Sequence, residues 1–266
     1  MRADPLREVF ASKGTAVNAW VSLDSRYLAE VLSYAGFDCV TVDLQHGMFG
    51  MQAAIGLLQA VSSGPAVPMA RCPSLDPAII GKLLDAGAYG LICPSIGSAE
   101  QAAAFVAACR YPPVGARSFG PARGLLYGGP DYVEHADDTI LTWAMVESAA
   151  ALSSLEEILS VPGLDGVYVG PNDLALSLGE RPGQSPVPRP VHSALEQVVT
   201  AAHAAGRLAG AFAADGAAAR GLADLGYDLV TPGNDVAMLR AAAAQSIGAI
   251  RRGRSDTPAE ARSAGY

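Results

Sequence analysis

The sequence is short of positive charge. Its 266 residues include 18 Lys and Arg against 26 Asp and Glu, which gives a formal net charge of −8. A chain with this balance has no global positive field to hold a nucleic-acid backbone or an anionic membrane, so neither is expected as a partner. Lysine occurs only twice, at Lys13 and Lys82. Neither follows a predicted strand, so a Schiff-base mechanism has no good candidate.

Cysteine and long apolar runs are scarce as well. Four cysteines, at positions 39, 72, 93 and 109, lie far apart and form no C-x-x-C pair. Their spacing excludes a cysteine zinc site and predicts reduced thiols in a cytoplasmic protein. Every apolar run is interrupted before the roughly eighteen residues of a membrane span, so we expect no signal peptide and no transmembrane helix. No G-x-S-x-G motif of a serine hydrolase occurs.

Apolar residues make up 50% of the chain and are arranged in a repeating pattern. Short runs rich in Val, Ile, Leu and Ala alternate with longer stretches of helical period about eight times, as in repeated β-α units. The predicted strands are 15–23, 37–43, 66–71, 89–93, 140–146, 166–169, 208–212 and 227–230. The predicted helices are 25–34, which Asp24 can cap, and 52–61, 76–86, 98–109, 149–159, 191–205, 215–225 and 235–250. Eight units in about 250 residues favour a (β/α)₈ TIM barrel. A doubly wound open sheet is the alternative, but the usual G-x-G-x-x-G after the first strand is missing.

The domain prediction is a single barrel over residues 1–250. A long Gly/Pro-rich connection at 111–138 interrupts it, and connections of that length tend to be lids, interfaces or disordered. The residues from 251 to 266 are polar and rich in Ala and Ser. We expect them to form a frayed tail.

Polar residues follow four of the predicted strands. His46 comes just after the second strand, Arg71 ends the third, Glu147 follows the fifth, and Asp173 closes the G-P-N-D sequence after the sixth. In a TIM barrel these strand ends meet at the active-site face. His46 is the best general base among the four histidines. Arg71 is suited either to stabilising an enolate or to a structural salt bridge.

Glu147 and Asp173 are hard oxygen ligands from neighbouring strands. With no Cys or second His beside them, they suit Mg²⁺ or Mn²⁺, with Co²⁺ as a further option. The alternative interpretation makes Glu147 a charge at a helix N-terminus and Asp173 a helix cap. Backbone amides near Gly170, Pro171 and Asn172 start a helix and suit a substrate carboxylate.

Asp85 stands out for its unfavourable position. It lies near the end of the predicted helix containing K-L-L-D-A-G-A, where a negative charge is mildly destabilising. That placement hints at a role other than a surface helix residue.

At these residues the chain resembles the HpcH/HpaI family of metal-dependent pyruvate aldolases. The likeness runs from about Phe37 to Asp235, with R-Y-P-P-x-G-x-R and V-G-P-x-D-L-x-x-S-L-G as its specific motifs. It implies a pyruvate-binding (β/α)₈ barrel that forms a homo-oligomer, commonly a hexamer such as a trimer of dimers, often with a terminal helix exchanged between subunits. It also implies reversible cleavage of a 4-hydroxy-2-oxo acid to pyruvate and an aldehyde.

The same resemblance assigns roles to individual residues. It makes His46 the catalytic base, Asp85 the aspartate that raises its basicity, and Arg71 the transition-state stabiliser. Glu147 and Asp173 become the metal ligands. The predicted substrate contacts are Arg71, Met145, Gly170, Pro171, Asn172 and Asp173.

Departures from the family pattern concern the substrate range. Gln45 replaces the usual acidic residue before the histidine, Met145 replaces a glutamine that contacts substrate, and Asn172 replaces a small residue. The loop at 121–127 also differs. An acyl-CoA lyase of the citrate-lyase-β type and a non-catalytic metabolite-binding barrel are the alternative functions, although no basic cluster suits the phosphates of CoA.

Overall fold

Eight parallel strands close into a barrel. The structure, a computed structural model, describes residues 2–251. The strands follow one another around the barrel in chain order, and β1 pairs with both β2 and β8. They are β1 Ala16–Val21, β2 Cys39–Asp43, β3 Val67–Arg71, β4 Gly90–Cys93, β5 Leu141–Val146, β6 Gly166–Val169, β7 Leu208–Ala213 and β8 Leu229–Pro232. The predicted (β/α)₈ barrel is confirmed, and the open doubly wound sheet is excluded.

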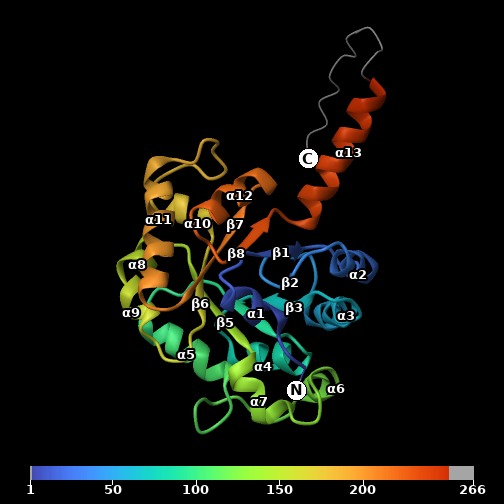
Figure 1. Ribbon diagram of the computed structural model, residues 1–266, viewed down its shortest axis with the longest axis vertical. Coiled ribbons are helices and arrows are strands. Elements are labelled where there is room, and N and C mark those ends of the chain that lie inside the picture. The colour runs from blue at the N-terminus through green and yellow to red at the C-terminus, as the bar shows by residue number, and fades with distance from the viewer. Residues whose placement is uncertain (1, 252–266) are drawn as a thin grey trace.

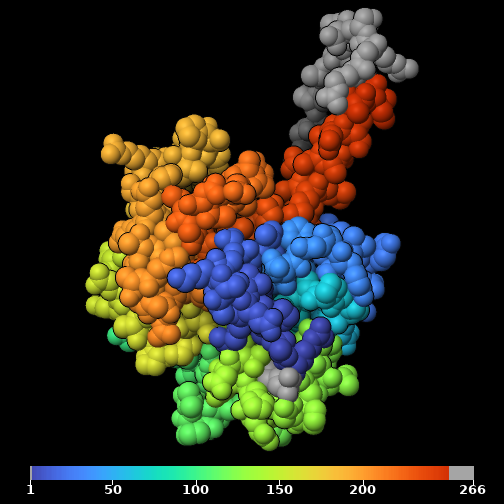
Figure 2. Space-filling model, in the orientation of Figure 1, coloured from blue at the N-terminus to red at the C-terminus, as the bar shows by residue number. Residues whose placement is uncertain are grey.

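Helices surround the barrel (Figure 1), and the last one extends away from it (Figure 2). The helices that follow the strands are α2 Arg26–Tyr34, α3 Met51–Val61, α4 Pro77–Asp85, α5 Ala99–Cys109, α8 Ala149–Ser153, α9 Leu155–Leu159, α10 Pro171–Ser177, α11 Arg189–Ala204, α12 Gly216–Asp224 and α13 Asp235–Arg251. Most lie within a few residues of the predicted bounds.

Two local expectations were wrong. Asp24 was expected to cap α2, but the cap is Ser25, whose Oγ accepts a hydrogen bond from the Leu28 N–H at 3.3 Å. The single helix expected over 149–159 is two helices, because the backbone at Ser154 leaves the helical conformation between α8 and α9.

The buried core of the barrel includes a chain of hydrogen-bonded polar side chains as well as apolar ones. Asn18 accepts from the Thr41 hydroxyl and donates to Thr231 Oγ1, both at 2.9 Å, and the Tyr168 hydroxyl lies 2.6 Å from the same Thr231 oxygen. All four side chains are buried. Because these buried polar groups satisfy one another, they limit one another's side-chain conformations.

The connection at 111–138 carries two short helices that the sequence did not predict. They are α6 Ala122–Gly128 and α7 Tyr132–Thr139. Arg117, at the end of the R-Y-P-P-x-G-x-R motif, is buried and donates to the Tyr132 hydroxyl at 3.0 Å. It also forms an ion pair with Asp85 at 2.9 Å. These contacts hold the connection against α4.

The first arginine of that motif is structural too. Arg110 is 3% exposed and forms an ion pair with Asp165 at 3.1 Å. Its guanidinium also donates to the backbone oxygens of Ile140 and Gly163, each at 3.0 Å. A Cβ on Gly115 would lie 2.4 Å from the Arg110 carbonyl oxygen, so the turn between the two arginines requires glycine. Both arginines of the motif therefore fix the chain path around the barrel.

Helix α1 (Pro5–Ala11) precedes the first strand and was not predicted. Its Leu6 is fully buried, and Phe10 meets Trp143 edge to face at 5.9 Å. Asp4 caps the helix, with Oδ1 accepting from the Leu6 N–H at 3.0 Å. The other oxygen, Oδ2, is buried and has no hydrogen-bond partner among residues 2–251. Burial therefore raises the pKa of Asp4 from 3.8 to about 7.

Replacing Asp4 by Asn should stabilise the protein at alkaline pH. Because the folded-state pKa is raised, the wild-type carboxyl contributes full stability only below pH 4, and this is lost as the pH rises through about 7. The loss amounts to at most about 4 kcal/mol. Asn keeps a capping oxygen but does not titrate. Thermal melts should show D4N above wild type at pH 8 and close to it at pH 4; an equal gap at both values would contradict this.

Three further expectations concern the cysteines, membrane-spanning helices and the polar tail. All four cysteines are buried and free, as predicted. Among residues 2–251, none of the helices combines the length and the apolar character that a bilayer span demands. The predicted polar tail at 251–266 lies outside the described residues except for Arg251, which ends α13.

Candidate active site

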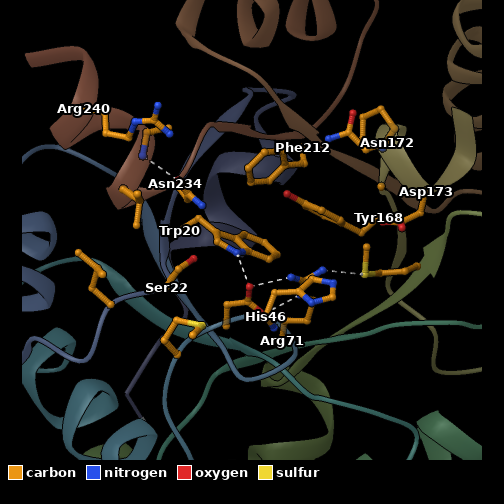
Figure 3. A pocket seen from close by; sticks show the side chains of 18 residues that line it. Trp20, Ser22, His46, Arg71, Tyr168, Asn172, Asp173, Phe212, Asn234 and Arg240 are labelled. Carbon is orange, nitrogen blue, oxygen red and sulfur yellow. Dashed lines mark hydrogen bonds and ion pairs between the residues drawn. The ribbon is translucent and has the colours of Figure 1, made fainter. Parts of the chain in front are cut away.

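A cavity of about 490 Å³ opens where the strands reach their carboxyl ends. Figure 3 shows side chains from several strand ends and from the start of α13 converging on it. Its lining includes these residues that the sequence singled out: His46, Arg71, Met145, Gly170, Pro171, Asn172 and Asp173. It also includes residues that the sequence did not single out: Trp20, Ser22, Leu23, Asp43, Met48, Tyr168, Phe212, Asn234, Val236, Ala237 and Arg240.

Arg71 is held in the cavity wall by Asp43. Its Nε and Nη2 donate to the two carboxylate oxygens at 2.8 and 2.7 Å, a bidentate pair between the ends of β3 and β2. Trp20 Nε1 donates to the same carboxylate at 3.1 Å (Figure 3). Burial alone would raise the pKa of Asp43, but its bonds to Arg71 keep that pKa below the usual range. The carboxylate therefore stays ionised and orients the guanidinium.

Asp43 was missed in the sequence, although a signal was there. The predicted second strand ends on Asp43 as the third ends on Arg71, and these two residues are direct partners in the β2/β3 register. Neighbouring parallel strands that end on opposite charges predict such a pair. Both interpretations of Arg71 therefore hold in part, since the residue forms a salt bridge and also lines the cavity.

The third guanidinium nitrogen of Arg71 faces a sulfur. Nη1 lies 4.0 Å from Met145 Sδ, and the guanidinium carbon is 4.9 Å from the centre of the Trp20 ring. Trp20 in turn stacks on Tyr168 at 5.8 Å and meets Phe212 edge to face at 5.5 Å. These aromatic side chains form the floor of the cavity and restrict Arg71 to one orientation.

Glu147 and Asp173 follow two neighbouring strands, β5 and β6. Asp173 lines the cavity, whereas Glu147 is not among its lining residues. Glu147 follows β5, and its Oε1 accepts from the Ser95 N–H at 2.6 Å. A Cβ on Gly170 would stand 3.0 Å from Glu147 Oε2, so glycine at this position leaves the carboxylate room beside the cavity. Burial raises the pKa of Glu147, and the charge of Asp173 raises it further. The two carboxylates are thus close enough to repel each other.

The alternative view of Asp173 as a helix cap is wrong. Gly170 is the N-cap of α10, and Asp173 lies inside the first turn of that helix. The first turn leaves the N–H groups of Asn172 and Asp173 without intrahelical partners. The side-chain oxygen of Asn172 binds the segment after α10, since its Oδ1 accepts from the Gly183 N–H at 3.0 Å.

A divalent cation fits the pair formed by Glu147 and Asp173. Two neighbouring carboxylates whose charges repel each other are what a cation would neutralise, and the absence of a side chain at Gly170 keeps space open beside Glu147. Within residues 2–251 no cluster of three His, Cys, Asp or Glu side chains could hold a metal. Only two protein ligands are available, which suits an ion that keeps waters and binds substrate oxygens.

His46 follows β2 at the cavity wall. Its backbone N–H donates to Asp43 Oδ1 at 3.3 Å, the same oxygen that accepts from Arg71. The imidazole itself is exposed to the cavity. Neither Lys13 nor Lys82 lines the cavity, in keeping with the absence of a Schiff-base lysine.

Asp85 is not brought to His46 within one chain. It is the last residue of α4, and barrel helices run opposite to the strands, so it lies at the far end of the barrel. There it lines a separate cavity, together with Arg117 and Ser118. Within a single subunit, Asp85 is therefore too far from His46 to raise its basicity, which is the role that the family resemblance implied.

A family model described as HpcH/HpaI aldolase/citrate lyase matches residues 17–242. The chain belongs to the HpcH/HpaI family. It is 42% identical over 236 residues to a hydroxypyruvate/pyruvate aldolase of Rhizorhabdus wittichii, covering 89% of this chain and 94% of the relative. It is 36% identical over 226 residues to a 4-hydroxy-2-oxo-heptane-1,7-dioate aldolase of Salmonella dublin, covering 84% and 85%.

A solved HpcH/HpaI structure shares the fold. The family protein from Burkholderia cenocepacia superposes with a TM-score of 0.86 at 32% identity, covering 94% of this chain and all of the other. The family and the fold that the sequence resemblance implied are therefore confirmed.

Proposed function

We propose that this protein is a divalent-metal-dependent carbon-carbon lyase that reversibly cleaves a 4-hydroxy-2-oxo acid into pyruvate and an aldehyde. The observation that carries the proposal is one cavity lined by Asp173 and by an oriented arginine, Arg71, with the Glu147 carboxylate beside its Gly170 wall. This combination suits chemistry in which negative charge develops on a 2-oxo acid.

Glu147 and Asp173 would hold the metal, which supplies positive charge for the carboxylate and keto oxygens of the substrate. Arg71 adds a second positive charge at the keto oxygen as the C3–C4 bond breaks, and Asp43 keeps its guanidinium from rotating away. The free N–H groups of Asn172 and Asp173 suit the substrate carboxylate. The chain thus binds the 2-oxo acid at the Asp173 side of the cavity.

His46 is the proposed base. It takes the proton of the C4 hydroxyl, directly or through a water, while the C3–C4 electron pair moves to C3 and the keto oxygen. The aldehyde leaves, and C3 of the pyruvate enolate takes up a proton to give pyruvate. The role that the resemblance gives to Asp85 needs the Asp85 of another copy of the chain, which is in keeping with the homo-oligomer that the family pattern implies.

Pyruvate release tests the proposal. A 4-hydroxy-2-oxo acid is incubated with the protein and Mg²⁺, Mn²⁺ or Co²⁺, and pyruvate is measured with lactate dehydrogenase. We expect metal-dependent release, and the comparison of the ions identifies the preferred one. Release of acetyl-CoA from an acyl-CoA thioester instead would favour the citrate-lyase type. Binding without turnover would favour a non-catalytic barrel.

The substitution Met145→Gln should tighten the binding of pyruvate. Met145 is 2% exposed, lines the cavity and places its sulfur against Arg71 Nη1, where a thioether is a weak acceptor. An amide at this position can hydrogen-bond the 2-oxo acid, which is worth about 0.5–1.5 kcal/mol. We expect the KM for pyruvate to fall about two- to tenfold, with a narrower range of aldehydes. Steady-state kinetics with pyruvate, hydroxypyruvate and short aldehydes would check this, and an unchanged KM and profile would contradict it.

A further inference from the structure

The cavity contains a second arginine that the proposed reaction does not use. Arg240 lies on α13 and lines the cavity wall with Val236 and Ala237. Unlike Arg71, whose guanidinium is bound to Asp43, Arg240 has no ion pair or hydrogen bond with any residue between 2 and 251. A cation at the wall of a substrate cavity with no partner in its own chain is available to a ligand.

The start of α13 is firmly attached to the barrel. Asp235 is 3% exposed and accepts from the N–H groups of Ser22, at 3.1 Å, and Leu23, at 3.0 Å. Asn234 Oδ1 accepts from the Ala237 N–H at 2.9 Å, which leaves the Asn234 amide nitrogen as a donor. These bonds fix the helix at the end of β1, and with it the side of the cavity on which Arg240 lies.

Charge is distributed unequally across the cavity. Figure 3 shows Arg240 and Asn234 on one side, Asn172 and Asp173 on the other, and Trp20 between them. The Asp173 side carries the negative charge of Asp173, with the Glu147 carboxylate beside Gly170. The α13 side carries a positive charge together with the Ser22 hydroxyl and the Asn234 amide. A ligand that spans the cavity would meet a metal at one end and donors at the other.

We propose that Arg240 is a specificity-determining residue that favours aldehydes carrying a negative charge. This inference rests on the proposed function, which places the 2-oxo acid at the Asp173 side. The aldehyde portion then extends over Trp20 toward α13, where an anionic group reaches Arg240 and the donors of Ser22 and Asn234. An aldehyde that ends in a carboxylate or a phosphate fits these donors, since guanidinium binds both.

The test compares pairs of aldehydes of which one member carries an anionic group and the other is neutral. Condensation with pyruvate and Mg²⁺ is measured for 4-oxobutanoate and its methyl ester, and for glyceraldehyde 3-phosphate and glyceraldehyde. We expect Arg240→Gln to lower kcat/KM about tenfold for the anionic member of a pair, as expected for loss of a charge-assisted bond, and to leave the neutral member unchanged. The pair that responds more strongly distinguishes carboxylate from phosphate.

Arg251→Gln is the matched control, since it removes the same charge from the other end of α13. This variant should behave as wild type with every aldehyde. An equal loss for charged and neutral aldehydes in Arg240→Gln would overturn the inference, as would no loss at all. If the wild type condenses pyruvate with neither kind of aldehyde, the proposed function itself fails, and the inference fails with it.

Discussion

Removal of divalent metal is expected to abolish cleavage of a 4-hydroxy-2-oxo acid. Without the metal that Glu147 and Asp173 would hold, the negative charge that develops on the keto oxygen is opposed by Arg71 alone. One guanidinium cannot replace the divalent charge. A metal acting as a Lewis acid contributes several kcal/mol, so EDTA should lower the rate by roughly 10³-fold or more. Adding Mg²⁺, Mn²⁺ or Co²⁺ should restore it. Pyruvate release before and after metal addition measures both effects.

Two controls separate a metal site from a structural effect. Asp173→Asn and Glu147→Gln should remain folded but should not recover with added metal, since each removes one of the two proposed ligands. Borohydride with pyruvate should leave the protein mass unchanged, because neither Lys13 nor Lys82 lines the cavity. A trapped lysine adduct would show a Schiff-base mechanism instead.

The substitution Arg71→Ala should lower kcat by about 10²- to 10³-fold, which corresponds to the loss of one charge-stabilising donor of a preorganised site. Stability should fall too, since Asp43 is 1% exposed and would be left as an unpaired buried carboxylate. Breaking a buried pair in this way costs about 3–5 kcal/mol. Single-turnover kinetics and thermal melts measure the two effects separately.

Arg71→Lys separates the effect of the charge of Arg71 on kcat from the effect of its fixed orientation. Lysine keeps the charge but cannot form the bidentate pair with Asp43, so kcat should lie between those of Ala and wild type. Asp43→Asn should lower kcat less than Arg71→Ala, because the guanidinium remains and loses only its fixed orientation. Near-normal turnover in Arg71→Ala at a temperature where it is folded would show that Arg71 is only structural.

Local patterns in the sequence were enough for the barrel and for the strand-end residues. The alternation of apolar strands with amphipathic helices predicts the (β/α)₈ topology, and the topology places the ends of all strands at one face. His46, Arg71 and Asp173 consequently share one cavity. Helix caps were less certain, since Asp24 and Ser25 are both good caps and only the backbone geometry decides between them.

Contacts between distant segments were not predictable in the same way. Asp85 binds Arg117 because the 111–138 connection folds back on α4, and no local pattern specifies that path. The cavity floor formed by Trp20, Tyr168 and Phe212 depends on which strand residues face inward at the same height. Helix α1 is short, and its stability comes from packing at the barrel, which a sequence window does not contain.

The most direct test is whether this cavity forms the enolate of pyruvate. Exchange of the pyruvate methyl protons for deuterium is followed by NMR in D₂O with Mg²⁺ and no aldehyde, so the aldehyde specificity plays no part. We predict metal-dependent exchange with the wild type, with a much lower rate for Arg71→Ala and for Asp173→Asn. Exchange by the wild type at the rate of pyruvate and Mg²⁺ alone would contradict enolate formation in this cavity.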